Sequence, residues 1–407
     1  MTESTGGYRA PASGGPVSRL ISPSLTGRWN RARLLQILYD VGPSSRAELA
    51  RIAEVTKTTI GSIVQPMLDA GILIEQEPRP SSVAGGKPAR PLWFSAAGRP
   101  IVAVHLGPGA VRSALITPTG EIQSHHAGRF SGDRDAQSRI ADVVVSCIET
   151  VLPVDGRRPL GIGVAVSGMV DTSAGRIVEV SLAPRMSGLD LGPLLSDRLG
   201  IPVHIDLHPR AQALGDRWFG LGRQVSSFAS VYCGEAIGAG FVIDGAVHRG
   251  PAGAGGEVGH TTVDAGGEIC RCGRRGCWET IATHRWLREQ ASELGLPHAR
   301  TMTVGPLAQL VTTGLPAAEH LLSAFARNIA VGLANIQQTI APGMFIMHGD
   351  VVRGGERLRA EIERYLVLGI PARPGASPTV SFASSGDDMT LLGAAGLVLS
   401  QSLDLLT

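Results

Sequence analysis

The sequence predicts an α/β protein made of a small N-terminal helical module and a larger body of strands and helices. Three observations support this fold class. Apolar residues recur at helical spacing before residue 70, apolar runs separated by glycine turns follow residue 100, and helical stretches lie between those runs. The chain has 407 residues, more than a single simple core usually holds, which predicts two or three domains.

The composition is that of a globular protein, but the charge is unevenly distributed. Hydrophobic residues make up 43% of the chain, and no apolar run approaches the roughly 18 residues of a membrane span. Residues 1–18 lack the apolar core of a signal peptide, so we expect a disordered tail there. Residues 1–100 hold 12 Lys and Arg against 7 Asp and Glu, a net charge of +5, whereas the whole chain carries +2. This asymmetry favours an N-terminal module that faces nucleic acid.

Residues 30–68 predict three helices. The first, Asn30–Val41, has an apolar stripe at helical spacing. Ser45 and Glu48 form the pattern of a capping box, which opens a short second helix. Thr56 is a suitable N-cap for the third helix, and Pro66 should kink the end of that helix because proline cannot donate a backbone hydrogen bond. The buried face of the third helix is predicted to consist of Ile60, Ile63, Val64, Met67 and Leu68.

The outer face of the third helix carries small or hydrogen-bonding side chains, and a basic loop follows it. Strands predicted at Ile72–Ile74 and Leu92–Phe94 enclose this loop, residues 81–90. A helix-turn-helix followed by such a hairpin is a winged helix, whose third helix can enter the major groove of DNA. We therefore assign residues 19–98 to a winged helix-turn-helix DNA-binding domain, although a three-helix bundle without a DNA role stays open. The candidate DNA contacts are Thr56, Lys57, Thr58, Ser62, Gln65, Lys87 and Arg90.

The body of the chain has the texture of an α/β domain. Apolar strands that end in glycine turns are predicted within residues 101–122, 161–171, 228–245 and 344–350. Helices are predicted at 141–152 and 320–340. Such mixing of strands and helices is typical of α/β folds.

Three of the five cysteines lie together and predict a metal site. His260, Cys270, Cys272 and Cys277 offer one imidazole and three thiolates, the ligands that Zn²⁺ prefers. Four protein ligands leave no open position for a catalytic water, so we expect one structural Zn²⁺ per chain. The spacing does not fit a DNA-binding finger, and cysteines without a metal are the alternative. The cysteine usage also favours a reducing cytoplasm over a disulfide framework.

The order of motifs resembles that of transcriptional regulators of the ROK family, a group of repressors, open reading frames and kinases. The motifs are SRAELA and AGGKPAR in the N-terminal module, and GIGVAVSG, IGAGFVIDG, EVGH, CRCGRRGCWET and LLGAAGLVL in the body. The combination of EVGH with the cysteine motif is highly specific. The resemblance covers nearly all of the chain from about Trp29. It implies a two-lobed actin-like ATPase fold for residues 99–407, with lobe one at about 99–215 plus 388–407 and lobe two at about 216–387.

The chain departs from the resembled family at the positions that carry its kinase chemistry. Family kinases have D-x-G-G-T in their first phosphate loop, where this chain has His105 and, in place of a glycine, Pro108. Their catalytic Asp corresponds to His208, so no carboxylate stands where a sugar hydroxyl would lose its proton. Asp206 is out of phase with that position and is expected to face the other side of its strand. Residues 348–350 replace a third ATP-binding turn, and we therefore expect no catalytic residues and no enzymatic activity.

About half of the family's sugar pocket is kept. Glu257, His260 and Glu279 match residues that hold sugar hydroxyls in the family, and carboxylates suit polyols because each accepts several hydrogen bonds. Arg185 and His208 replace other pocket residues and add two potential cations, which favours an effector with an anionic group. A closed pocket with these residues in salt bridges is the alternative. The candidate ligand-binding residues are Glu257, His260, Glu279, His208, Arg185 and Gly168.

These features predict a cytoplasmic transcriptional regulator, most simply a repressor of carbohydrate metabolism genes. Its expected partners are double-stranded operator DNA and a small sugar or sugar phosphate. No membrane association is expected. A symmetric operator needs at least a dimer, so we expect a homo-oligomer, a dimer or a tetramer. Two alternatives stay open. One is a sugar kinase with atypical residues, and the other is a DNA-binding regulator controlled by a protein partner without a small ligand.

Overall fold

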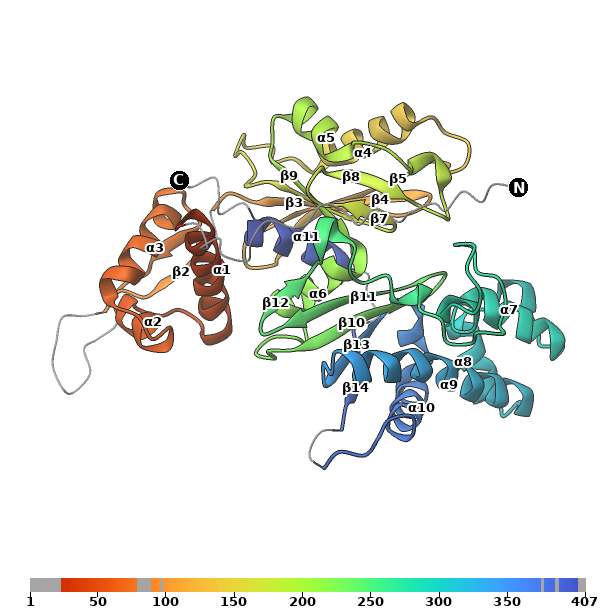
Figure 1. The fold of residues 1–407 in the computed structure, drawn as a ribbon. Coiled ribbons are helices and arrows are strands. Elements are labelled where there is room, and N and C mark those ends of the chain that lie inside the picture. The colour runs from red at the N-terminus through yellow and green to blue at the C-terminus, as the bar shows by residue number, and fades with distance from the viewer. Residues whose placement is uncertain (1–22, 79–88, 96–97, 375–376, 385–387, 402–407) are drawn as a thin grey trace, which may run out of the picture.

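The computed structural model describes residues 23–401 except for residues 79–88, 96–97, 375–376 and 385–387. Within this part, the chain forms an N-terminal module followed by two lobes (Figure 1). Each of the two lobes is built on its own five-stranded sheet. The predicted tail (residues 1–18) and most of the predicted wing, with Lys87, lie outside the described residues.

The N-terminal module consists of three helices and a two-stranded antiparallel sheet. Local side-chain chemistry begins two of the helices as predicted. Ser45 and Glu48 form the capping box, and the Oγ1 of Thr56 accepts a hydrogen bond of 3.1 Å from the backbone N–H of Thr59. The elements are α1 (Pro23–Val41), α2 (Arg46–Ile52), α3 (Lys57–Asp69), β1 (Leu73–Glu75) and β2 (Leu92–Phe94).

Helix α3 buries one face and exposes the other. Ile60, Val64 and Met67 are fully buried between the helices, while the other two residues of the predicted stripe are half-buried. The helix continues past Pro66 and ends at Asp69. Pro66 lies in the last turn, so the hydrogen bond that it removes does not end the helix there.

The two sheets of the body share one strand order. In each sheet the first three strands of the chain are antiparallel neighbours, and the last two strands run parallel to the first. The first sheet has the order β5-β4-β3-β6-β9, with β3 (Ile101–Leu106), β4 (Ala110–Ile116), β5 (Ile122–Arg129), β6 (Ile162–Val166) and β9 (Val203–Leu207). The second has the order β12-β11-β10-β13-β14, with β10 (Phe228–Cys233), β11 (Ile237–Ile243), β12 (Ala246–His248), β13 (Met344–His348) and β14 (Thr379–Phe382).

Helices α6 (His208–Phe219) and α11 (Asp388–Gln401) lie between the two sheets, and each belongs in sequence to the opposite sheet (Figure 1). Helix α6 follows the last strand of the first sheet but packs on β10 and β11 of the second. Helix α11 follows the last strand of the second sheet but packs on β3, β6 and β9 of the first. The two helices also pack closely on each other, because a Cβ added at Gly393 would lie 1.8 Å from the carbonyl oxygen of Ala211.

The remaining elements cover the outer faces of the sheets. A small antiparallel hairpin, β7 and β8, extends lobe one, and four helices gather on the lower lobe, where Figure 1 labels α7, α8, α9 and α10. Their bounds are α4 (Gln137–Val151), β7 (Met169–Asp171), β8 (Arg176–Glu179), α5 (Leu191–Leu199), α7 (His284–Glu293), α8 (Val304–Thr312), α9 (Pro316–Thr339) and α10 (Gly355–Leu368).

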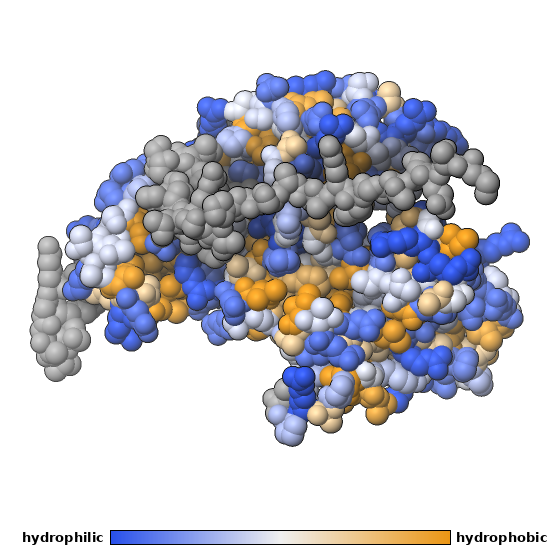
Figure 2. Space-filling model, viewed as in Figure 1, coloured by the Kyte–Doolittle hydropathy of each residue, from blue (hydrophilic) through white to orange (hydrophobic). Residues whose placement is uncertain are grey.

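The apolar core of the N-terminal module is continuous with the core of the body. Buried side chains of the module, such as Leu34 and Phe94, belong to one cluster with Trp218 of α6 and Leu391 of α11. The face of the molecule in Figure 2 is largely hydrophilic, with hydrophobic residues in scattered groups. No helix in the described residues is long and apolar enough to cross a membrane.

Candidate metal centre and adjoining ligand site

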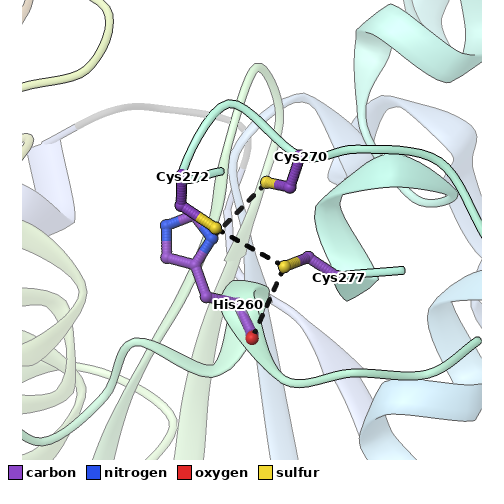
Figure 3. Close-up of side chains that lie close together, drawn as sticks. All are labelled: His260, Cys270, Cys272 and Cys277. Carbon is purple, nitrogen blue, oxygen red and sulfur yellow. Dashed lines mark hydrogen bonds between the residues drawn. The ribbon is translucent and has the colours of Figure 1, made fainter. Parts of the chain in front are cut away.

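Four side chains from one loop region converge as a metal-binding set. One ligand atom each of His260, Cys270, Cys272 and Cys277 lies within 4.8 Å of all the others (Figure 3). The Sγ of Cys270 is 3.7 Å from the Nδ1 of His260, and the Sγ atoms of Cys272 and Cys277 are 3.6 Å apart. A tetrahedral ion with bonds of about 2.3 Å would hold its ligands roughly 3.8 Å apart. The four residues therefore fit a single ion bound by all of them.

The backbone around the cysteines forms a tight loop that depends on a glycine at position 276. The N–H of Cys270 donates to the carbonyl of Arg274 at 2.7 Å. An isolated antiparallel β-bridge pairs Thr262 with Cys277. Gly276 has a φ of +67°, and a Cβ there would lie 1.5 Å from the carbonyl oxygen of Asp264. Only glycine fits this position. The glycines of the CRCGRRGCW segment thus place the three thiols on one side.

The three thiols differ in how readily they ionise without a metal. Burial opposes ionisation of Cys272, but hydrogen bonds from Arg274 outweigh it and lower the pKa of this thiol to about 7. Burial raises the pKa of Cys277 to about 12 and also raises that of Cys270. A bound divalent cation would supply the charge that ionises these two thiols. The side chain of Arg274 hydrogen-bonds to Cys272 and stabilises its thiolate form.

Two carboxylates flank the cluster and share a region with His260. The Oε1 of Glu279 accepts a hydrogen bond of 2.8 Å from the N–H of Ile237, and its Oε2 lies 3.9 Å from the Nδ1 of His260. Glu257 is half-buried three residues before His260, and burial raises the pKa of its carboxyl group. Glu257 also interacts electrostatically with His260, Glu279 and Arg210. The structure thus brings together the three predicted hydroxyl-binding residues.

Sequence reasoning missed a buried ion cluster beside these carboxylates. The Oδ1 of Asp206 accepts from the Nε of Arg210 at 2.6 Å, and its Oδ2 accepts from the Nε of Arg249 at 2.7 Å. Arg210 also donates to the carbonyl oxygens of Gly253, at 2.8 Å, and Gly255, in the loop before Glu257. The i, i+4 spacing of Asp206 and Arg210 was the available signal.

The expectation that Asp206 faces away from the site is wrong. Strand β9 ends at Leu207, and His208 begins α6, so the alternation of a strand does not continue to His208. Asp206 is fully buried and its carboxylate is occupied by the two guanidinium groups. It is therefore held by two arginine side chains beside the candidate ligand site.

His208 lies between residues of the two lobes. Its ring contacts Tyr232 of β10 edge-to-face, with ring centroids 4.5 Å apart, and stacks on His105 of β3 at 5.8 Å. The Nε2 of His105 in turn lies 3.2 Å from the Oγ of Ser167. Histidine and tyrosine rings thus occupy the place where the family resemblance puts a catalytic carboxylate.

The structure does not bring Arg185 into contact with His208. Arg185 is exposed in a short helix of lobe one, and its Nε donates to the carbonyl of Asp133 at 3.4 Å. Gly168, after β6, approaches β8 so closely that a Cβ would lie 2.6 Å from a methyl group of Val180. The arginine that interacts electrostatically with Glu257 is instead Arg210, which already pairs with Asp206.

The predicted DNA-contacting side chains gather on one exposed surface of the N-terminal module. The predicted contacts on α3 and at its N-cap are all exposed. Arg90 is also exposed, with its Nη1 3.7 Å from Glu75 of β1. The exposed predicted contacts are Thr56 at the N-cap and Lys57, Thr58, Ser62 and Gln65 on α3.

Known proteins resemble this chain over different lengths. A model described as the ROK family matches residues 101–401. The xylose repressor of Bacillus subtilis (strain 168) is 25% identical over 385 residues, which cover 93% of this chain and 97% of that protein. The glucokinase of Thermotoga maritima is 27% identical over 325 residues, which cover 73% of this chain and 96% of the glucokinase.

A solved structure shows the same fold from the N-terminal module to α11. It is the crystal structure of a ROK family transcriptional regulator, a homologue of the Escherichia coli Mlc protein. The two structures superpose with a TM-score of 0.79 and 23% identity, over 94% of this chain and 98% of the other. The predicted α/β fold, an actin-like body preceded by a helical region, is confirmed at this level.

Proposed function

The chain belongs to the ROK family, and we propose that it is a transcriptional repressor that binds DNA through its N-terminal module and a sugar through its two-lobed body. The observation that carries this proposal is the extent of the similarity. The match with a xylose repressor covers 93% of this chain, whereas the match with a glucokinase covers 73%. The additional length corresponds to a module that a kinase does not need.

The module has the parts of a winged helix-turn-helix. Helices α2 and α3 meet at the capped turn, and β1 and β2 flank the wing segment. The exposed polar face of α3 would enter the major groove, where Lys57 meets phosphates and Gln65 reaches base edges. Recognition of a symmetric operator would require a homo-oligomer, a dimer or a tetramer.

The body offers hydrogen-bond acceptors that suit a polyol. Glu257 and Glu279 would accept hydrogen bonds from sugar hydroxyls beside His260. Since Arg210 and Arg249 are both already paired with Asp206, we propose that hydroxyl groups contribute more to recognition than a phosphate does. We further propose that His260 and the three cysteines hold one structural Zn²⁺, which fixes both ends of the segment that carries the two glutamates.

A sugar kinase is the second candidate, and its support is the similarity to glucokinases. Two features of this chain speak against it. His208 replaces the family's catalytic carboxylate, and the nearby carboxylate of Asp206 is occupied by two arginines. A carboxylate whose two oxygens already accept hydrogen bonds from arginines is poorly positioned to act as the general base for a sugar hydroxyl.

DNA footprinting on the region upstream of the protein's own gene tests the proposal. We expect protection of a symmetric site that weakens when D-xylose, D-glucose or their phosphates are added. Calorimetry with the same four compounds would show which of them binds. Sugar-dependent formation of ADP from ATP, without any protected DNA site, would overturn the proposal in favour of the kinase.

A further inference from the structure

Helix α6 is almost completely buried and yet strongly polar. All residues from His208 to Trp218 are buried, and they include four side chains with charged or amide groups. Burying such groups is costly unless each finds a partner, so their partners reveal what the helix holds in place. The four residues are Arg210, Gln212, Asp216 and Arg217.

The first turn of α6 is bound to the ligand site. Arg210 pairs with Asp206 and donates to the carbonyls of Gly253 and Gly255. Both carbonyls belong to the loop that leads directly into Glu257, the half-buried carboxylate of the site. A shift of this loop on ligand binding would therefore act on the Arg210 guanidinium.

The middle of α6 contacts α11 and β13. Gln212 donates to the Oγ1 of Thr390 on α11 at 3.0 Å, and the Oδ2 of Asp216 lies 2.7 Å from the Nε2 of His348 on β13. The close approach of Ala211 to Gly393 leaves no free space between α6 and α11. A helix packed in this way moves as a rigid body, and its 12 residues span roughly 18 Å.

The last turn of α6 is bound to the N-terminal module. The guanidinium of Arg217 lies 3.4 Å from the Oδ2 of Asp40 on α1, and the backbone carbonyl of Arg217 accepts from the Nε2 of Gln36 at 3.3 Å. The ring of Tyr39 on α1 packs edge-to-face on Trp218 and Phe219. The end of α6 thus contacts the same helix of the module through an ion pair, a hydrogen bond and an aromatic cluster.

The junction between α6 and the module also contains open space. A cavity of about 370 Å³ lies between α1, α6 and lobe two, and Arg33, Asp40, Arg217 and Asp244 are among its lining residues. Close-packed junctions resist small displacements, whereas a junction with a polar cavity can accommodate a second arrangement. The Nε of Arg217 is buried in this region without a hydrogen-bond partner among the described residues.

We propose that α6 couples the ligand site to the DNA-binding module, with Arg210 and Arg217 as its two positioning residues. The inference rests on the proposed function, because it concerns how a bound sugar alters the module. Movement of the loop before Glu257 displaces Arg210, α6 carries the displacement to Arg217, and the pair with Asp40 passes it to α1. The module then takes a second orientation relative to the lobes, in which DNA affinity differs.

Hydrogen exchange measured by mass spectrometry on the full chain tests this coupling, with D-xylose and D-glucose as the probes. In the unaltered protein, we expect a bound sugar to change amide exchange in peptides that cover residues 30–41. Arg217→Met and Asp40→Asn should keep the sugar Kd within about twofold but reduce the exchange response of α1 by about threefold or more. Asp40→Asn preserves shape and serves if Arg217→Met fails to fold. The control Arg198→Met removes an exposed pair with Asp142 in lobe one and should leave the response unchanged.

The outcomes separate the two proposals. If a sugar binds but α1 does not respond, or if both variants respond like the unaltered protein, the coupling through α6 is wrong and the sugar-binding function stands. If none of the sugars or their phosphates binds, the proposed function fails and the coupling fails with it. A response lost in Arg198→Met as well would show a general loosening of the body and would also overturn the role of α6.

Discussion

The Nε of Arg210 lies 2.6 Å from the Oδ1 of Asp206, and both side chains are at most 1% exposed. Arg249 approaches the other oxygen of the same carboxylate at 2.7 Å. Two buried charged groups at the junction of β9 and α6 therefore share an ion cluster with the partly exposed Arg249. Through Arg210 this cluster joins the start of α6 to the loop of Gly253 and Gly255, which precedes Glu257.

Replacing Arg210 with methionine should strongly destabilise the protein. The change leaves Asp206 buried with only Arg249 as an ionic partner, and breaking a buried pair costs about 3–5 kcal/mol. We expect a fall of roughly 3 kcal/mol in the free energy of unfolding, measured by urea denaturation. Arg198→Met, which breaks an exposed pair of similar length, should cost less than about 1 kcal/mol. Equal stability of the two variants would contradict the structural role of the buried cluster.

Replacing Cys272 with serine should release the metal. A serine hydroxyl is a poor substitute for a thiolate in a closed four-ligand site, so we expect close to no zinc in the purified variant by mass spectrometry. The melting temperature should fall too, because metal binding contributes to folding. Cys147→Ala, which changes a buried cysteine of α4, should retain one zinc per chain. Zinc retained in Cys272→Ser at that same level would argue against the assigned ligands.

Replacing Lys57 with alanine should weaken DNA binding at every sequence. Lys57 is exposed in the first turn of α3, where a lysine contacts phosphates. The slope of log affinity against log salt concentration should decrease by about one, as measured by fluorescence anisotropy with a labelled duplex. Arg364→Ala removes an exposed charge from α10, far along the chain, and should change neither affinity nor slope. A Lys57 variant with an unaltered salt slope would exclude a phosphate contact at this position.

The pair between Glu235 and Arg288 should contribute stability only above acidic pH. Two hydrogen bonds of 2.8 Å from the Arg288 guanidinium lower the pKa of the Glu235 carboxyl group below 4.5. A carboxyl with a lowered pKa stabilises the fold above its unfolded pKa and loses that contribution as the pH falls through its folded pKa. Arg288→Met should therefore cost up to about 1 kcal/mol at pH 7, since the pair is partly exposed, and progressively less as the pH falls below the unfolded pKa of the glutamate.

Urea denaturation across this pH range measures the difference. Glu235→Gln should show the same loss, and the double variant should lose little more than either single one. A cost of Arg288→Met that stays constant from pH 7 to pH 3 would show that packing, not charge, is responsible.

Features set by neighbouring residues could be predicted from the sequence. The capping box of Ser45 and Glu48 and the N-cap at Thr56 depend on side chains three residues apart, and both are present. The metal set depends on a short loop with its glycines, and its four ligand atoms converge. In these cases the interacting groups lie close in the chain, so spacing alone carries the information.

Contacts between distant segments could not be predicted in this way. The backbone partners of Arg210, the carbonyls of Gly253 and Gly255, lie more than 40 residues later in the chain. The partners of Arg217 lie in the N-terminal module. The ligand contact of Arg185 stays a prediction. Its place in a motif suggested this contact, and in the structure its side chain is exposed and donates to a backbone carbonyl.

The exchange of α6 and α11 between the two sheets has a consequence for any attempt to divide the molecule. A fragment that stops before Asp388 would leave β3, β6 and β9 without the helix that packs on them, and a fragment that starts at Phe228 would strip the second sheet of α6. Each half would expose an apolar sheet face and aggregate when expressed alone. The two halves of the body therefore have to be kept together in one chain, even though their sheets are similar.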